Sequence, residues 1–458
     1  MSQSENYKWL VLIGTGIVTV ALGVDYAIVN TALAPIQNEL HASVAQLQWL
    51  MSGFGLLFVG FLVAMGRLAD LKGRRVFFYL GAGGFALASL GAGLAHSIHM
   101  LIAMRVLQGL FCAAIFPSGM ALIANAFPED ERPKALGIYA SFLGVGFAIG
   151  PLLGSVIVSL LNWRWIFLFN VPLTVISFII CLPILKESKK LHPPPVDWWG
   201  VSLLIISISA LVFAVSEGNT YGWLSHLIIA AFIVSVIALL IFIGIERRVC
   251  APLISLTLFA NAGFTLGLLI FIIAIALPWG VIFMMTLYLH KSVGLSTHWV
   301  GIILFSMTLM TMIGPAVSGS YLGKKGPRGV CYAVCALSIV SLLLFTRLQA
   351  YGPIWLVVIA FILFGSAWGA GNGIAVPLGL SKLATTEDSG FIVGAMNTIM
   401  NLIGIVMLAI TAAILEHYSR NKVLPFVSGL HVVCTMLLAI SVVLSIIAMI
   451  VLHRFYRP

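Results

Sequence analysis

Charged residues are scarce in this chain. Only 8% of its 458 residues are Asp, Glu, Lys or Arg, against about 25% in an average soluble domain, whereas 61% are hydrophobic. A water-soluble fold of this length needs far more charge to cover its surface. The composition therefore excludes an ordinary cytosolic enzyme, a disulfide scaffold and a disordered protein. It predicts an all-α integral membrane protein.

Cysteine is also rare, and its six residues are scattered inside or beside apolar runs. None has the spacing of metal ligands, so we expect six buried small apolar side chains and no metal site. The 24 Lys and Arg residues exceed the 14 acidic residues and give a net charge of +10. No basic patch with interleaved aromatic residues accompanies this excess, so we expect no nucleic-acid partner.

Long apolar runs are abundant. A helix that crosses the bilayer needs about 20 apolar residues. Polar, charged or Pro-rich points divide the chain into fourteen runs, at 9–35, 46–68, 76–95, 99–127, 134–160, 164–185, 197–216, 224–245, 262–290, 298–322, 329–347, 353–380, 389–416 and 431–452. The lipid bilayer is therefore the expected environment of most of the chain.

Basic residues gather on one side of this predicted membrane protein. When the loops alternate sides, eighteen of the 24 Lys and Arg residues fall on one side and five on the other, and Arg105 lies within a span. Because basic loops remain in the cytoplasm, we predict that both termini are cytoplasmic. The short loops and tails favour a bacterial inner membrane.

An internal repeat links the two ends of the chain. The segment from Gly66 to Arg75 after span two has the same Gly, Gly and Arg spacing as the segment from Gly319 to Arg328 after span ten. We therefore predict two parallel halves, an arrangement found in secondary transporters. The predicted domains are an N-terminal six-helix half (1–185), a cytoplasmic linker (186–196), two inserted helices with their loops (197–257) and a C-terminal six-helix half (258–458).

Four motifs carry a resemblance to a known family. They are Gly66 to Arg75, Arg105-Val-Leu-Gln108-Gly109 in span four, Gly146-x-x-x-Gly150-Pro151-x-x-Gly154 in span five, and Asp25 to Leu33 in span one. In this order, and on these spans, they resemble the motifs of the major facilitator superfamily, most closely its fourteen-span drug/proton antiporters. The resemblance implies two six-helix halves plus two inserted helices, and a monomer that uses the proton gradient and no cofactor.

Asp25 is the one acidic residue deep inside a predicted span. It lies about sixteen residues beyond Trp9, or roughly 24 Å along a helix, and acids within a membrane are costly and usually functional. We predict that Asp25 couples transport to protons, with Arg105 tuning it and Gln108 joining the same polar cluster. The alternatives are a carboxyl neutralised for packing and an Arg105 side chain that extends to the membrane interface.

Two groups of residues are predicted to act in gating. Gly66, Asp70, Gly73, Arg74 and Arg75 form a cytoplasmic loop whose glycines allow a tight turn and whose acid can pair with a neighbouring arginine or cap a helix. The alternative is a role for its basic residues in membrane orientation alone. Gly146, Gly150, Pro151 and Gly154 form a small-residue face with a predicted kink, for which ordinary close packing is the alternative.

Aromatic, amide and methionine residues near the middle of the spans are candidate substrate contacts, because such surfaces can adapt to many apolar molecules and attract cations. They are Tyr26, Asn30, Phe54, Trp279, Met284, Met285, Trp368, Asn372, Asn397 and Asn401. Core packing or an interfacial position is the alternative for each of them.

These features predict a proton-coupled multidrug efflux antiporter for lipophilic, cationic compounds that works by alternating access. An exporter of one natural metabolite in the same fold is the nearest alternative. A membrane-embedded enzyme would need a cluster of nucleophile, base or metal ligands within the spans, and the sequence shows none. A receptor that does not transport would not require both Asp25 and the repeated loop motif.

Overall fold

The computed structural model describes residues 3–128, 131–187, 196–249, 252–349, 352–381, 389–420 and 426–455. Within these ranges the chain is helical and contains no strand. Thirteen of the described helices are long and apolar enough to cross a membrane, and the shorter apolar stretch Trp165–Cys181 lies at the sixth predicted span. The all-α, multi-pass membrane fold predicted from the sequence is confirmed.

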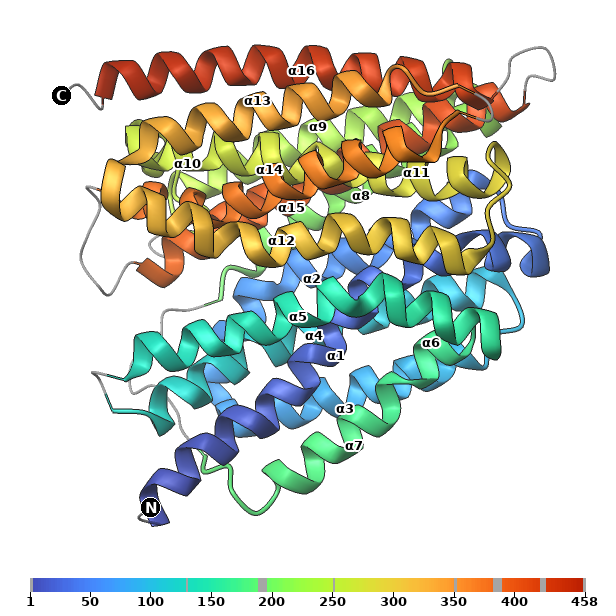
Figure 1. Ribbon diagram of the computed structural model, residues 1–458. Coiled ribbons are helices and arrows are strands. Elements are labelled where there is room, and N and C mark those ends of the chain that lie inside the picture. Colours follow the sequence, from blue (N-terminus) through green and yellow to red (C-terminus); the bar gives the residue numbers. More distant parts are fainter. Residues whose placement is uncertain are drawn as a thin grey trace. The chain divides into compact units, whose positions relative to one another are not determined.

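The chain forms two compact units (Figure 1). The first comprises Met1–Ile205 and Val249–Ala251, and the second comprises Ile206–Arg248 and Pro252–Pro458. The first unit holds α1 (Gln3–Leu40), α2 (Val44–Lys72), α3 (Arg74–Gly93), α4 (Ile98–Ala126), α5 (Arg132–Leu160), α6 (Trp165–Leu168) and α7 (Asn170–Cys181). Helix α8 (Trp198–Tyr221) begins in the first unit and continues in the second. The predicted linker at 186–196 lies mostly outside the described residues.

The second unit contains the remaining helices. They are α9 (His226–Glu246), the 3-10 helix η1 (Leu256–Ala260), α10 (Ala262–Phe271), the π-helix η2 (Ile272–Ala276), α11 (Pro278–Lys291), α12 (Thr297–Lys325), α13 (Pro327–Phe345), α14 (Ile354–Leu380), α15 (Ser389–Arg420) and α16 (Phe426–Phe455). The ninth predicted span is therefore α10, η2 and α11 in succession. Because Pro278 has no N–H and crowds the preceding turn, a local π segment before it is a physically reasonable adjustment.

Local sequence explains where several helices begin. The side chain of Ser43 accepts a hydrogen bond from the backbone N–H of Gln46, and the Gln46 side chain accepts one from the backbone of Ser43. This reciprocal capping box satisfies N–H groups that the first helical turn leaves without partners. Ser97 and Ser225 cap α4 and α9 with single bonds of the same kind.

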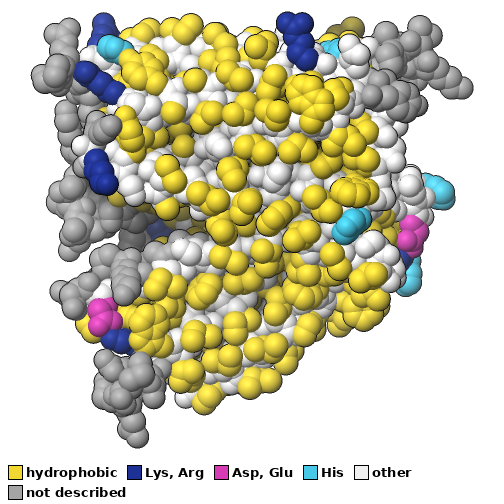
Figure 2. Space-filling view, in the orientation of Figure 1, with side chains coloured by type: hydrophobic (Ala, Val, Ile, Leu, Met, Phe, Trp, Pro, Cys, Tyr) yellow, Lys and Arg dark blue, Asp and Glu magenta, His cyan; other side chains and the backbone are white. Residues whose placement is uncertain are grey.

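The outward faces of the helices are apolar. Leu87, Ile179 and Leu240 are each more than 60% exposed, as expected for side chains that contact lipid. Figure 2 shows hydrophobic side chains over the visible helix faces, with charged side chains and histidines gathered toward the helix ends. The five cysteines in the described part of the chain are buried and free, as predicted, and Cys250 lies outside it.

The internal repeat is present in the packing of both units. In the first unit, a side chain at Gly109 of α4 would overlap the backbone of Phe54 in α2. In the second unit, a side chain at Gly369 of α14 would meet Gly314 of α12 in the same way. The two members of each pair are displaced by the same 260 positions. Equivalent glycines on α4 and α14 therefore bring α2 and α12 close in the two units.

Candidate functional site

Asp25 lies at the centre of a buried polar cluster in the first unit. Helix α1 carries Asp25, and α4 carries Arg105 and Gln108 one turn apart. Arg105 Nη1 donates to Asp25 Oδ2 at 2.5 Å and to Gln108 Oε1 at 2.9 Å. Asp25 and Gln108 are 0% exposed and Arg105 is 1% exposed. The structure thus brings together the three residues predicted to act in proton coupling.

Two further side chains complete this cluster from α3 and α7. Asn170 Nδ2 donates to Asp25 Oδ1 at 2.7 Å, and Gln108 Nε2 donates to the same oxygen at 3.3 Å. Ser89 Oγ accepts from Gln108 Nε2 at 2.7 Å and from Asn170 Nδ2 at 3.4 Å. We call these five residues the Asp25 cluster. Its members come from four helices, so the carboxylate is held by the packing of the whole unit.

Sequence reasoning missed the roles of Ser89 and Asn170. A polar residue within an apolar span needs a partner, which is the one signal that could have singled them out. Asn170 lies in the sixth predicted span, and the sequence there says nothing about what its amide contacts. Ser89 is the one serine of α3, whose charged residues lie in its first turn.

Aromatic rings surround the guanidinium of Arg105. Its carbon lies 4.4 Å from the centre of the Phe54 ring and 5.9 Å from that of Phe167. Its Nε also donates to the carbonyl oxygen of Leu50 at 3.4 Å. The side chain therefore points into the unit, which rules out the alternative that it extends to the membrane interface. Cation–π contacts of this kind contribute most where water is excluded.

The chemistry available to the cluster follows from its burial. Moving two charges out of water is costly, and the loss is offset only when both are paired and hydrogen-bonded. The Asp25 carboxylate meets this condition through Arg105, Asn170 and Gln108. A proton added to this carboxyl would weaken its attraction for Arg105, so the charge state of Asp25 is linked to the contact between α1 and α4.

The first-unit candidates for substrate contact lie next to this cluster. The Tyr26 ring is 5.7 Å from that of Phe54 and 6.0 Å from that of Phe147, measured between ring centres. Asn30, one turn along α1, donates from Nδ2 to the carbonyl oxygen of Ala27 at 3.3 Å. Tyr26 and Phe54 thus form one aromatic group, and Phe54 is also in contact with Arg105.

The second-unit candidates are spread over α11, α14 and α15. Asn397 and Asn401 both donate to carbonyl oxygens one turn earlier on α15. Trp279 packs against Gly404, where any larger residue would strike the indole ring. Trp368 is buried and Asn372 is exposed. Met284 and Met285 are both 0% exposed, so in this arrangement they pack as core residues.

The predicted cytoplasmic loop is wrong in its extent: Gly66 and Asp70 lie in α2, Arg74 and Arg75 lie in α3, and Gly73 alone joins the two helices in a tight turn. Gly73 has φ +127°, a conformation that strongly favours glycine. Asp70 accepts from Arg74 Nε at 2.7 Å, so it pairs with a neighbouring arginine, one of the two roles predicted for it. Gly66 faces Pro117 of α4, and a Cβ there would lie 3.3 Å from the proline ring.

Glu187 is a loop partner that sequence reasoning missed. It follows α7 and accepts from the backbone N–H groups of Arg75 at 3.1 Å and Val76 at 3.3 Å. A carboxylate placed at these groups caps α3 and complements its positive end. A Cβ on Gly73 would lie 2.7 Å from the Glu187 carboxyl carbon. Glycine is therefore required here by both the turn and the cap.

The glycine stripe of α5 faces the helix that carries Asp25. Side chains at Gly146 or Gly154 would overlap atoms of α1, and a Cβ at Gly150 would lie 2.8 Å from that of Ala27. On the α1 side, a Cβ at Gly23 would overlap the backbone of Leu143. The close approach expected of these glycines is present, with Pro151 inside the helix as predicted. The stripe thus holds α1 close against α5.

The second unit holds two buried acids in its described part, Glu246 and Glu416. Glu416, near the end of α15, is only 3% exposed. Asn219 of α8 donates to the nearby carbonyl oxygen of Ala413 at 2.6 Å, joining the inserted helix to α15. The sequence places Glu416 at the last position of a predicted span, where an acid would ordinarily be solvated. Among the described residues, no group of His, Cys, Asp and Glu could hold a metal ion.

Comparison with known proteins agrees with this fold. The chain is 30% identical to the tetracenomycin C resistance and export protein of Streptomyces glaucescens, over 79% of this chain and 67% of that protein. It is 31% identical to the multidrug resistance protein Stp of Mycobacterium tuberculosis, over 73% of this chain and 63% of that protein. It is also 28% identical to the methylenomycin A resistance protein of Bacillus subtilis, over 91% of this chain and 89% of that protein.

A solved structure shares the fold. The crystal structure of a bacterial homologue of the human lysosomal transporter Spinster, inward-facing and unoccupied, superimposes with a TM-score of 0.68 at 17% identity. It covers 98% of this chain and 97% of that one. A sequence model of one protein family, the Major Facilitator Superfamily, matches residues 15–407, which is most of the chain. The chain therefore belongs to the Major Facilitator Superfamily of membrane transporters.

Proposed function

We propose that this protein exports lipophilic, cationic compounds in exchange for protons. The observation that carries the proposal is the Asp25 cluster, an ion pair between two helices that is sealed from solvent within a transporter fold. Relatives named for multidrug resistance and for antibiotic export support a role in drug efflux. We further propose a monomer in a bacterial inner membrane with both termini in the cytoplasm.

The Asp25 cluster suggests how a proton can drive the cycle. When Asp25 is charged, Arg105 is bound to it and α1 is joined to α4. When Asp25 takes up a proton, Arg105 loses its counter-charge, and the contact between the helices weakens. Since Phe54 touches both Arg105 and Tyr26, this change reaches the aromatic group proposed to contact substrate. Alternating access would then link proton release on one side of the membrane to substrate binding.

The loop motif and the glycine stripe are proposed to guide this movement. The stripe holds α1 against α5, so we expect a change at Asp25 to alter the contact that Arg105 makes between α1 and α4. The turn at Gly73, fixed by Glu187, is proposed to act as part of a cytoplasmic gate.

An exporter of one natural metabolite is the second candidate. Two relatives are named for a single antibiotic each, tetracenomycin C and methylenomycin A. A narrow substrate profile would favour this candidate over multidrug export, while leaving the role proposed for Asp25 unchanged.

The test uses inside-out vesicles with an imposed proton gradient and a panel of fluorescent lipophilic cations. We expect gradient-dependent uptake by the native protein, its loss in Asp25→Asn, and its retention in Glu217→Gln. The last variant is a matched control that removes a carboxylate from α8, outside the Asp25 cluster. Uptake by Asp25→Asn at the native rate would reject the coupling role. Transport of none or one of the panel would favour the single-metabolite exporter.

A further inference from the structure

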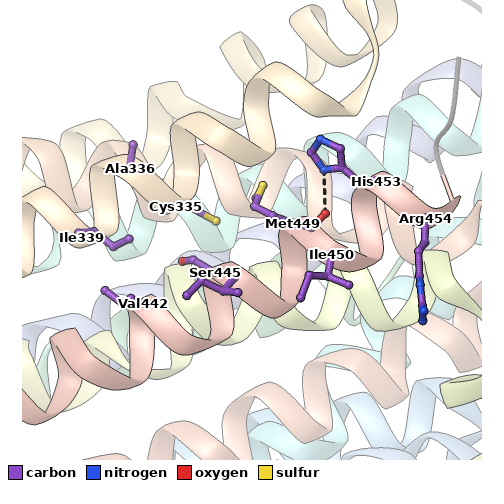
Figure 3. Close-up of a pocket in the computed structure, with 10 residues that line it drawn as sticks. Cys335, Ala336, Ile339, Val442, Ser445, Met449, Ile450, His453 and Arg454 are labelled. Atoms are coloured by element: carbon purple, nitrogen blue, oxygen red, sulfur yellow. Dashed lines mark hydrogen bonds between the residues drawn. The ribbon is translucent and has the colours of Figure 1, made fainter.

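A groove runs between α13 and α16 on the surface of the second unit (Figure 3). Its volume is about 640 Å³. Ala336 and Ile339 of α13 line one wall, and Val442, Ile446 and Ile450 of α16 line the other. Both helices are long and apolar enough to cross a membrane. The groove therefore lies on a face that is apolar enough to stand within a membrane.

The length of the groove matches an elongated apolar ligand. Eleven residues separate Val442 from His453, which corresponds to about 17 Å along a helix that rises 1.5 Å per residue. Ile446 is 56% exposed and Ile450 is 52% exposed, so the α16 wall is open along this distance. Apart from Ser445 and Cys335, the groove offers no polar side chain before its end.

The end of the groove is basic. His453 and Arg454 stand in the last turn of α16, and both line the groove (Figure 3). His453 Nδ1 lies 2.9 Å from the carbonyl oxygen of Met449 and therefore donates to it. Its Nε2 lies 3.1 Å from the Tyr332 hydroxyl and forms a hydrogen bond with it. His453 is thus held by two partners, and its ring and the Arg454 side chain point to opposite sides of α16 (Figure 3).

Arg454 supplies the charge at this end. Its side chain is exposed, and within the described part of the chain it makes no ion pair. A guanidinium offers N–H groups in a planar fork that matches the oxygens of a phosphate. Basic residues at the end of a transmembrane helix also attract anionic lipids electrostatically.

We propose that this groove binds one anionic phospholipid, with an acyl chain between α13 and α16 and the phosphate on Arg454. A ligand that is apolar over about 17 Å and anionic at one end fits both parts of the site. A helix from a second copy fits less well. In a symmetric dimer through this groove, α13 and α16 would pack against themselves, and neither helix contains an acid that could pair with Arg454.

The test uses two photoactivatable lipids in phosphatidylcholine vesicles that contain the full-length protein. One is phosphatidylglycerol and the other is phosphatidylcholine, and both carry the same diazirine-labelled acyl chain. After illumination, labelled peptides are mapped by mass spectrometry. We expect phosphatidylglycerol to label Ile339, Val442 and Ile446 about fivefold more than phosphatidylcholine does, the size of effect that one basic group contributes at an anionic lipid.

Three variants locate the site. Arg454→Gln should remove the preference for phosphatidylglycerol while leaving labelling by phosphatidylcholine unchanged. Arg248→Gln, which neutralises an exposed arginine just beyond α9, should leave the preference intact. Ala336→Trp should fill the groove and reduce labelling there by both lipids.

Other outcomes would overturn the proposal. Equal labelling by the two lipids in the native protein, or an unchanged preference in Arg454→Gln, would mean that the groove holds only ordinary surrounding lipid. Protein–protein crosslinks through Ile446 in place of lipid adducts would show that a second copy occupies it. These readouts measure lipid binding alone, so their result does not depend on whether the protein exports compounds in exchange for protons.

Discussion

Arg105 Nη1 lies 2.5 Å from Asp25 Oδ2, and the two side chains that form this contact are at most 1% exposed. The contact joins α4 to α1 at a point where neither side chain can reach water. A paired charge at such a site is satisfied only as long as both partners stay in place. The stability of the first unit and the charge state of Asp25 therefore both depend on the pair formed by Asp25 and Arg105.

The first prediction concerns the cost of breaking this pair. Arg105→Met should lower the free energy of unfolding by about 3–5 kcal/mol, because it leaves a buried carboxylate without its counter-charge. The double variant Asp25→Asn with Arg105→Met should lose less than Arg105→Met alone, because it removes both charges. Denaturation of the detergent-solubilised protein, followed by circular dichroism, measures both differences.

Arg74→Met provides the comparison for this pair. Arg74 and Asp70 form a partly exposed pair one helical turn apart, a type that contributes about 0.3–0.5 kcal/mol. Equal losses from Arg74→Met and Arg105→Met would contradict the importance assigned to the buried pair. So would a double variant less stable than Arg105→Met.

A second prediction concerns the amide of Asn170. Asn170→Leu keeps a side chain of similar size but removes the donor 2.7 Å from Asp25 Oδ1. A hydrogen bond to a charged group contributes about 1.5–3 kcal/mol, so we expect a loss of stability in that range. Thr174→Val, one turn along α7, removes a hydroxyl that bonds only to the Asn170 carbonyl oxygen, and it should cost less. The ranking of the two variants in a denaturation experiment decides the point, and a reversed ranking would reject the role of the amide.

A third prediction concerns the glycine stripe. Gly146→Leu should prevent α5 from packing on α1 and greatly reduce the yield of folded protein, because its side chain would overlap the backbone of Val20. Gly144→Leu, on the same helix, should be tolerated, because nothing lies within 4 Å of its Cβ position. The fraction of each variant that elutes as a single species in size-exclusion chromatography is the measurement. Comparable yields for both leucine variants would show that the helices do not require close contact.

Part of the site could be predicted because membrane burial leaves few options for a charged group. Asp25 and Arg105 are the two opposite charges inside predicted spans of the same half, so their pairing follows from the cost of isolating either. Gln108 follows Arg105 by one turn and shares its helix face. Ser89 and Asn170 could not be placed, because whether helices meet at the same depth depends on tertiary packing.

The fold was predictable to a similar extent and for similar reasons. Apolar length identifies a span, so fourteen runs could be counted from the sequence. The π segment at Ile272–Ala276 and the division of span six at Phe169 could not, because both are local backbone adjustments to packing. Met284 and Met285 show the same limit for ligand contacts, since an apolar helix carries no signal that separates its core face from one facing a cavity.

The last prediction concerns the cap that Glu187 places on α3. Glu187→Ala should lower the free energy of unfolding by about 0.5–2 kcal/mol, the range measured for lost helix caps. Gly73→Ala should also lower the free energy of unfolding, because φ +127° is strained for alanine and the added Cβ would crowd the Glu187 carboxylate. Since the new methyl group meets that carboxylate, the two substitutions share an interaction, and their effects on the free energy of unfolding should not be additive.

Gly244→Ala, where nothing lies within 4 Å, is the control for adding a methyl group, and denaturation of the single and double variants gives the coupling. Strict additivity of Glu187→Ala and Gly73→Ala would mean that the turn and the cap act independently, which would contradict the arrangement of the loop described above.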